Sequence, residues 1–184
     1  MEEPKVSKRD HEITVNGDTR VDPWFWLREQ EDPETIPYLE AENAYTKGVM
    51  KDTEGLQEAL YREMRARIKE DDESVPVKEG DYYYYTRFET GGQYRIHCRK
   101  HGSLKGKEEV ILNVNALAEG LDYMRVCVCR NSPDHRWLVY STDVDGSEEY
   151  TLYMKDLETG EVLEEEILKT YYSLAWASDN QTFF

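Results

Sequence analysis

Long apolar runs are missing from this chain, and no stretch approaches the roughly 18 apolar residues that a membrane-spanning helix requires. Met1 is followed by the acidic residues Glu2 and Glu3 instead of the basic region and apolar core of a secretory signal. We therefore expect a cytoplasmic protein that does not bind membranes.

Cysteine is scarce. Cys98, Cys127 and Cys129 form neither an even set for disulfides nor a Cys-x-x-Cys metal pair. The spacing of two residues places Cys127 and Cys129 on the same face of a predicted strand. We expect three buried free thiols and no metal site.

Basic residues are few. The chain has 39 acidic and 23 basic residues, which give a net charge of -16. This charge repels nucleic acid and anionic membranes and attracts basic peptides, although acidity can also serve solubility alone. One basic island stands out, and we expect it to be a solvated strand edge and loop. Its members are Arg95, His97, Arg99, Lys100, His101, Lys105 and Lys107.

Catalytic signatures are also missing. A serine hydrolase of the α/β type places its nucleophile in a Gly-x-Ser-x-Gly turn between a strand and a helix, and this pattern does not occur. Ser103 and Ser147 each follow a glycine in predicted loops. None of the four histidines, His11, His97, His101 and His135, has a convincing catalytic context. We assign no catalytic residue, and the substrate-binding residues stay unknown.

Cofactor motifs are missing too, because the chain has no Walker loop and no Gly-x-Gly-x-x-Gly. The run from Asp143 to Gly146 resembles part of a calcium loop, but Ser141 and Leu152 stand where that loop needs acidic ligands. We expect a hairpin turn there, with no metal and no cofactor.

The residues that are present predict a helical first third. The hydrophobic content of 39% fits a globular chain, with fraying over residues 1–12. Asp32 and Pro33 are typical of a helix start, and one helix is expected over residues 33–50. The next begins near residue 52 or 53 and carries an apolar stripe that must be buried on something. The stripe consists of Leu56, Leu60, Met64 and Ile68.

After residue 72 the pattern is mainly β. Residues 82–88 and 93–99 predict a hairpin around a Gly91-Gly92 turn. Further strands are expected at residues 110–112, 126–129, 137–141 and 150–155.

A weak repeat suggests how these strands are organised. The segment around Asp134 resembles the segment around Asp179, 45 residues later, and each has a turn aspartate followed by an apolar strand. This period fits the four-stranded blade of a β-propeller. The predicted fold is an α+β segment: an N-terminal helical extension over residues 1–72, then an incomplete antiparallel β-propeller of roughly two and a half blades over residues 73–184.

Several motifs together resemble the N-terminal part of the oligopeptidase B group within the prolyl oligopeptidase family of serine peptidases. The matching runs are Asp22-Pro23 with Trp26-Leu27-Arg28, Tyr38-Leu39-Glu40-Ala41-Glu42-Asn43-Ala44-Tyr45, Arg67-Ile68-Lys69-Glu70-Asp71-Asp72, Gln93-Tyr94 with Cys98-Arg99, and Ser132-Pro133-Asp134. Two departures touch no chemistry: Trp24-Phe25 replaces a tyrosine-rich form, and His135 replaces the commoner glycine of a blade turn.

The resemblance implies a propeller that restricts access to the active site of an α/β-hydrolase domain. That domain carries a Ser, Asp and His triad and cleaves short peptides after Lys or Arg. The hydrolase domain is missing from these 184 residues, so we expect the chain alone to be inactive, and its status as an enzyme stays open. The apolar stripe would pack on the hydrolase domain or on the propeller flank.

Three interpretations of the chain remain. The ending Gln181-Thr182-Phe183-Phe184 resembles the start of a blade strand and favours a fragment of a longer peptidase. A stand-alone partial propeller that binds peptides or proteins without catalysis is the alternative. A split enzyme, whose hydrolase comes from a separate chain, is the third.

Overall fold

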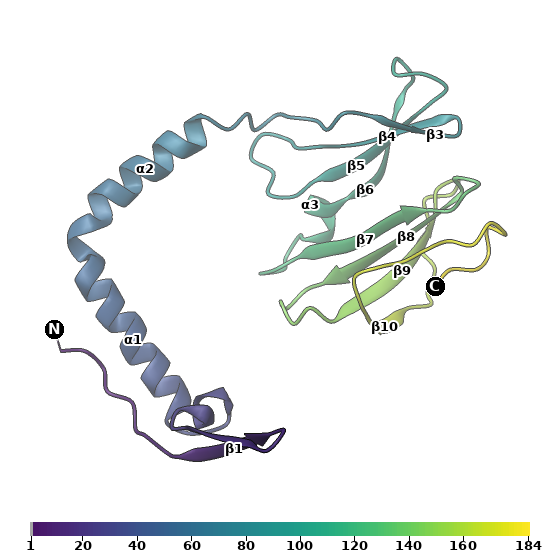
Figure 1. The fold of residues 1–184 in the computed structure, drawn as a ribbon. Helices are drawn as coiled ribbons and strands as arrows, with labels where there is room; N and C mark the ends of the chain where they lie inside the picture. The colour runs from purple at the N-terminus through teal and green to yellow at the C-terminus, as the bar shows by residue number, and fades with distance from the viewer. Residues whose placement is uncertain (1) are drawn as a thin grey trace. The chain divides into compact units, whose positions relative to one another are not determined.

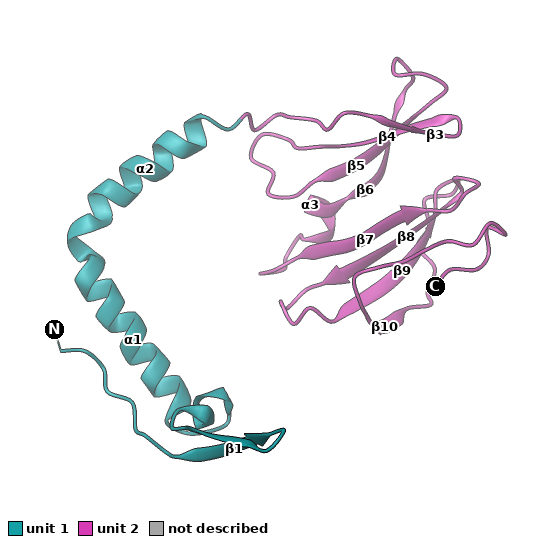
Figure 2. Cartoon of the chain, viewed as in Figure 1, with its two compact units in different colours: residues 1–68 teal, residues 69–184 magenta. Residues whose placement is uncertain are grey.

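The computed structural model describes residues 2–184 and divides the chain into two compact units, residues 1–68 and residues 69–184 (Figure 2). No helix in the described part of the chain is both long and apolar enough to cross a membrane.

The first unit begins with a β-hairpin where the sequence predicted fraying and helix (Figure 1). Strand β1 (His11–Val15) pairs antiparallel with β2 (Asp18–Asp22). The turn residues Asn16 and Gly17 both have positive φ, 53° and 83°. Asn-Gly is the preferred pair for such two-residue turns, so the sequence contained this signal and our prediction missed it.

The residues just before this hairpin are also held in place. The Arg9 guanidinium lies 3.9 Å from the Trp26 ring centroid and 2.5 Å from a carboxylate oxygen of Asp32. The Trp26 indole N–H donates to the carbonyl of Ser7 at 3.0 Å. The expectation that residues 1–12 fray is therefore wrong for residues 7–12, because Trp26 and Asp32 provide local partners.

Two helices follow a short 3-10 helix, η1 (Phe25–Arg28). Helix α1 (Thr35–Met50) and helix α2 (Glu54–Ala66) are joined by the 3-10 turn η2 (Lys51–Thr53), and both helices were predicted. Helix α1 starts two residues later than expected, because the Asp32 carboxylate accepts from the backbone N–H of Glu34 at 3.0 Å in a turn before the helix.

Among the described residues of the first unit, no other element covers the apolar stripe, of which Leu56, Leu60 and Met64 lie on α2 and Ile68 lies just after it. Leu56, Leu60, Met64 and Ile68 are between 46% and 65% exposed. The periodicity correctly predicted the helix, but the burial that it also predicted does not occur among the described residues.

The second unit contains two four-stranded antiparallel sheets (Figure 1). The first has the order β3-β4-β5-β6, and its strands are β3 (Val77–Glu79), β4 (Tyr82–Arg87), β5 (Ile96–His101) and β6 (Glu108–Asn113). The second has the order β10-β9-β8-β7, and its strands are β7 (Arg125–Asn131), β8 (Trp137–Asp143), β9 (Tyr150–Asp156) and β10 (Ile167–Thr170). Consecutive strands are neighbours throughout, as in propeller blades.

The predicted hairpin and the four further strands are all present. Strands β3 and β10 were not predicted, and neither was the four-residue helix α3 (Val114–Leu117). Helix α3 is capped by Asn113, whose side chain accepts from the backbone N–H groups of Asn115 and Ala116. These three elements are too short for periodicity to indicate them.

The repeat around Asp134 and Asp179 is structural. Each carboxylate accepts from the backbone N–H two residues later, that of Arg136 or Gln181. The residue after each aspartate, His135 or Asn180, has a positive φ of 64° or 60°. The second copy leads to a bridge between Trp176 and Phe183, the beginning of a further strand pair after two complete blades.

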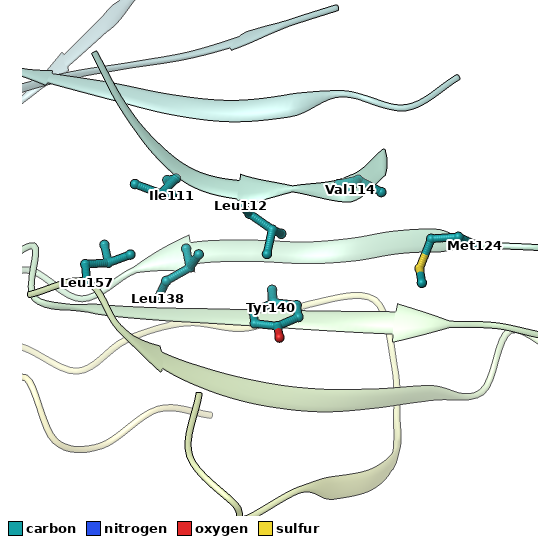
Figure 3. Close-up of a cluster of buried hydrophobic side chains, with 7 residues drawn as sticks. All are labelled: Ile111, Leu112, Val114, Met124, Leu138, Tyr140 and Leu157. Atoms are coloured by element: carbon teal, nitrogen blue, oxygen red, sulfur yellow. The ribbon is translucent and has the colours of Figure 1, made fainter. Parts of the chain in front are cut away.

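The main core lies between the two sheets (Figure 3). Ile111 and Leu112 come from β6 and meet Leu138 and Tyr140 of β8, all at most 4% exposed. Val114, Met124 and Leu157 complete the cluster. Each such side chain contributes about 1.5–3 kcal/mol when fully buried, so this cluster holds the blades face to face.

The cysteine prediction was right in part. All three cysteines are free, but only Cys98 is fully buried. A register shift between Val126 and Cys129 interrupts the alternation of β7. Val126 and Cys129 both pack on the main core, while the Cys127 Sγ lies 3.9 Å from the carbonyl oxygen of Tyr172. The shared face predicted for Cys127 and Cys129 is therefore wrong, because a β-bulge adds a residue between them.

Candidate functional site

The contact between the two sheets, here called the blade joint, holds a buried charged side chain. Its centre is Arg99 of β5, which is 4% exposed. The Arg99 Nε and Nη2 donate to the two carboxylate oxygens of Glu109 at 2.8 and 2.9 Å. These two parallel, charge-assisted hydrogen bonds offset the free-energy cost of removing the guanidinium from water.

Arg99 also crosses from the first sheet to the second. Its Nη1 donates to the backbone carbonyl of His135 at 2.5 Å, and its guanidinium carbon lies 4.3 Å from the Tyr82 ring centroid. Burial opposes the charge, but the hydrogen bonds that Arg99 donates to Glu109 and Tyr84 outweigh it and hold the pKa of Arg99 above its usual value. Arg99 therefore remains charged while it links the two blades.

His135 completes the link from the second sheet. Its Nδ1 is hydrogen-bonded to the Tyr84 hydroxyl at 2.9 Å, and burial raises the pKa of Tyr84 to about 12. A Cβ built on Gly80 would lie only 2.5 Å from the His135 Nε2, so this position accepts glycine alone without movement of the ring. The absence of a side chain at Gly80 leaves room for the His135 ring.

A cavity of about 380 Å³ adjoins this link. Glu79 of β3 and Asn131 of β7 line it, together with the thiols of Cys98 and Cys129. Burial is the main cause that raises the pKa of Cys98 to about 11 and of Cys129 to about 12. Both thiols are protonated at neutral pH, so neither is an activated nucleophile.

The remaining histidines lie in structural contacts. His11 stacks on Phe25 with ring centroids 3.9 Å apart, and His101 meets the edge of Tyr82 at 5.0 Å. Burial, followed by the charge of Arg95, lowers the pKa of His97. The two serines that follow a glycine lie in loops as predicted: Ser103 is in the loop after β5 and Ser147 in the loop after β8, and neither precedes a helix.

The run from Asp143 to Gly146 forms the expected hairpin turn. The Asp143 carboxylate accepts from the backbone N–H groups of Asp145, Gly146 and Glu148 at 2.8–3.0 Å. Burial opposes ionisation, but these bonds outweigh it and lower the pKa of Asp143. Within residues 2–184, no group of three acidic, cysteine or histidine residues is arranged to hold a metal ion.

The basic island is only partly the solvated edge that we predicted. Strand β5 lies between β4 and β6, so it is not an edge, and Arg99 is buried. The prediction failed because charge alone does not indicate which strand receives a neighbour on both sides. Lys105 and Lys107 do lie in the loop between β5 and β6, and Lys105 is exposed.

Comparison with known proteins identifies the lineage. Residues 4–184 match the profile described as the prolyl oligopeptidase N-terminal β-propeller domain. The chain belongs to the prolyl oligopeptidase family. Among curated members of this family, dipeptidyl aminopeptidase BI of Pseudoxanthomonas mexicana is 39% identical over 98% of this chain and 28% of its own length. Protease 2 of Moraxella lacunata is 36% identical over 96% of this chain and 26% of its own length.

Solved structures of the prolyl oligopeptidase family agree. Oligopeptidase B from Leishmania major superposes with a TM-score of 0.82 at 30% identity, over 95% of this chain and 27% of that one. The Trypanosoma brucei oligopeptidase B, with antipain covalently bound, gives a TM-score of 0.81 at 31% identity. The chain thus spans a little over a quarter of these relatives and corresponds to their N-terminal part, the helical extension and first blades.

Sequence reasoning did not find the blade joint. Arg99 was placed in a solvated island, and no local pattern predicts that a strand arginine will reach the turn of another sheet. His135 was noticed as the substitute for a blade-turn glycine, and that departure was the available signal.

Proposed function

We propose that this chain is the N-terminal, non-catalytic segment of an oligopeptidase B-like serine endopeptidase. The observation that carries the proposal is the superposition on oligopeptidase B over 95% of this chain but only 27% of that enzyme. The proposed partner is an α/β-hydrolase domain with a Ser, Asp and His triad, which follows in the same chain or comes from a separate one.

In this proposal the blades restrict access to the active site. A short flexible peptide reaches the active site, while a folded protein is excluded by size. The net charge of -16 supports a preference for basic peptides, and the proposed hydrolase cleaves them after Lys or Arg. The free thiols of Cys98, Cys127 and Cys129 support a reducing compartment, and we infer the cytoplasm.

The test has two parts. The purified chain, incubated with arginyl and lysyl reporter peptides, is expected to give no turnover above a buffer control. Turnover that a serine-directed reagent abolishes would overturn the non-catalytic assignment. The reading frame and its neighbours are then searched for a Gly-x-Ser-x-Gly turn followed by an Asp and a His.

The alternative is a stand-alone partial propeller that binds a partner without catalysis. The exposed apolar stripe favours a binding role, because three apolar residues on one face of α2, and Ile68 just after the helix, are at least 46% exposed. If no hydrolase frame exists in the same genome, this alternative replaces the peptidase segment.

A further inference from the structure

A second pocket in the blade joint has an unusual charge. It has a volume of about 270 Å³ and is lined by Arg95 just before β5, by His97 on β5, by Met124 just before β7 and by Val126 on β7. Arg125 lines it as well, and none of the described residues that line it is acidic. In a chain with 39 acidic and 23 basic residues, a pocket with two arginines, a histidine and no carboxylate is an exception.

The basic groups of Arg95 and His97 are available to a ligand. Arg125 already donates to Glu148 at 3.0 Å. Arg95 lies 5.7 Å from the Phe88 ring centroid, and within residues 2–184 its guanidinium has no ion pair. The positive charge of Arg95 helps to lower the pKa of His97, after the larger effect of burial. The charge of Arg95 thus acts on His97, and among residues 2–184 no carboxylate neutralises Arg95.

The walls and size of the pocket narrow the ligand class. Val114 and Met124, which belong to the main core, provide an apolar wall beside the basic groups. Typical small-molecule pockets measure about 300–1,000 Å³, so this one suits a group no larger than about one amino-acid residue. A planar guanidinium fork matches a carboxylate. These features favour a ligand that has a carboxylate next to an apolar side chain.

We propose that the pocket between Arg95, His97 and Met124 binds the C-terminal carboxylate of a short peptide. Arg95 donates to the carboxylate, His97 donates a further hydrogen bond, and the last side chain lies against Val114 and Met124. A C-terminal carboxylate is the one negative charge that every unmodified peptide carries, including a basic one. The choice of a peptide as the source rests on the proposed function, whereas recognition of a carboxylate does not.

The test compares three probes on the full chain by nuclear magnetic resonance titration or calorimetry. They are N-acetyl-Gly-Leu with a free carboxylate, the same compound as its C-terminal amide, and inorganic phosphate. We expect the acid to bind at least about tenfold more tightly than the amide, since charge-assisted hydrogen bonds are worth about 1.5–3 kcal/mol. The His97 imidazole signals should shift with the acid and not with the amide.

Arg95→Gln should abolish the preference for the acid, and Arg95→Lys should reduce it in part because the fork is lost. The matched control is Lys105→Gln, which removes one positive charge from the exposed β5–β6 loop and should keep the preference. Equal binding of acid and amide, an unmoved His97 signal, or an unchanged preference in Arg95→Gln overturns the proposal. Phosphate binding as tight as the acid assigns the pocket to inorganic anions instead.

The test of the carboxylate site and the test of the proposed function can fail independently of each other. Turnover of a reporter peptide, or the lack of a hydrolase reading frame, would overturn the proposed function without affecting the measured preference for an acid. A lack of preference would remove the carboxylate site and leave the blades and their family unchanged.

Discussion

Arg99 shows how a charged side chain becomes a structural link between two sheets. Its side chain is 5% exposed, while that of its partner Glu109 keeps 42% exposure. The pair is therefore asymmetric: the arginine has left water, and the carboxylate remains at the surface. The arginine is held by Glu109, by the His135 carbonyl and by the Tyr82 ring, and these contacts compensate its desolvation.

Removal of this arginine should weaken the second unit. Arg99→Met should lower the free energy of unfolding by about 2–3 kcal/mol, below the full cost of breaking a buried pair because Glu109 stays hydrated. Urea denaturation followed by tryptophan fluorescence measures the change. The control Arg125→Met breaks an ion pair that is about half exposed on both sides and should cost less than about 1 kcal/mol. Equal losses would contradict the assigned role of Arg99.

His97 makes stability depend on pH. Its pKa is lowered in the folded chain, chiefly by burial, so the folded state binds fewer protons than the unfolded state at mildly acidic pH. We expect stability to fall as pH decreases below about 6.5, the usual histidine pKa, and to level off below the folded pKa. Denaturation from pH 7.5 to 4.5, compared between the natural chain and His97→Gln, isolates this contribution. An identical pH dependence in both chains would contradict it.

Helices and strands were predicted more reliably than their surroundings. The periodicity of α2, and the β-rich composition of β4 and β5 around a glycine turn, indicated the correct elements, because local patterns follow backbone geometry. The bulge in β7 and the interior position of β5 were missed, because both depend on pairing between distant residues. The apolar face of α2 was predicted, but its cover was not determined, because periodicity indicates an apolar face and not what packs on it.

Two leucine substitutions compare a buried position in the main core with an exposed position on α2. Leu138→Ala on β8, where the leucine is 1% exposed in the main core, should lower the free energy of unfolding by about 2–5 kcal/mol. Leu60→Ala on α2, where the leucine is 46% exposed, should cost less than about 1 kcal/mol in this chain. Thermal denaturation by circular dichroism measures both. A large loss for Leu60→Ala would show that the stripe is covered in solution.

Two properties belong to the chain as a whole: its fold and the electrostatic field that its net charge produces. The fold places it at the N-terminal part of the prolyl oligopeptidase family, and the relatives are more than three times longer. The electrostatic field comes from a net charge of -16, which affects association and solubility and does not depend on the particular fold.

This charge predicts salt-dependent association with basic peptides. A fluorescent peptide rich in Lys and Arg should bind more weakly as the NaCl concentration rises from 0.01 to 1 M, because the screening length falls from about 30 Å to about 3 Å. Fluorescence anisotropy measures the affinity. An acidic peptide of equal length is the control and should not bind at low salt. A salt-independent affinity would contradict an electrostatic attraction.

The sequence alone determined the lineage, the two long helices and the mainly β pattern after them, and the repeat around Asp134 and Asp179, because motifs and turn residues are local and keep their spacing. Tertiary structure decided which residues meet. It buried Arg99 against His135, opened the pocket at Arg95 and left the stripe of α2 uncovered. These outcomes depend on contacts between residues far apart in the chain, and local propensity carries no information about such contacts.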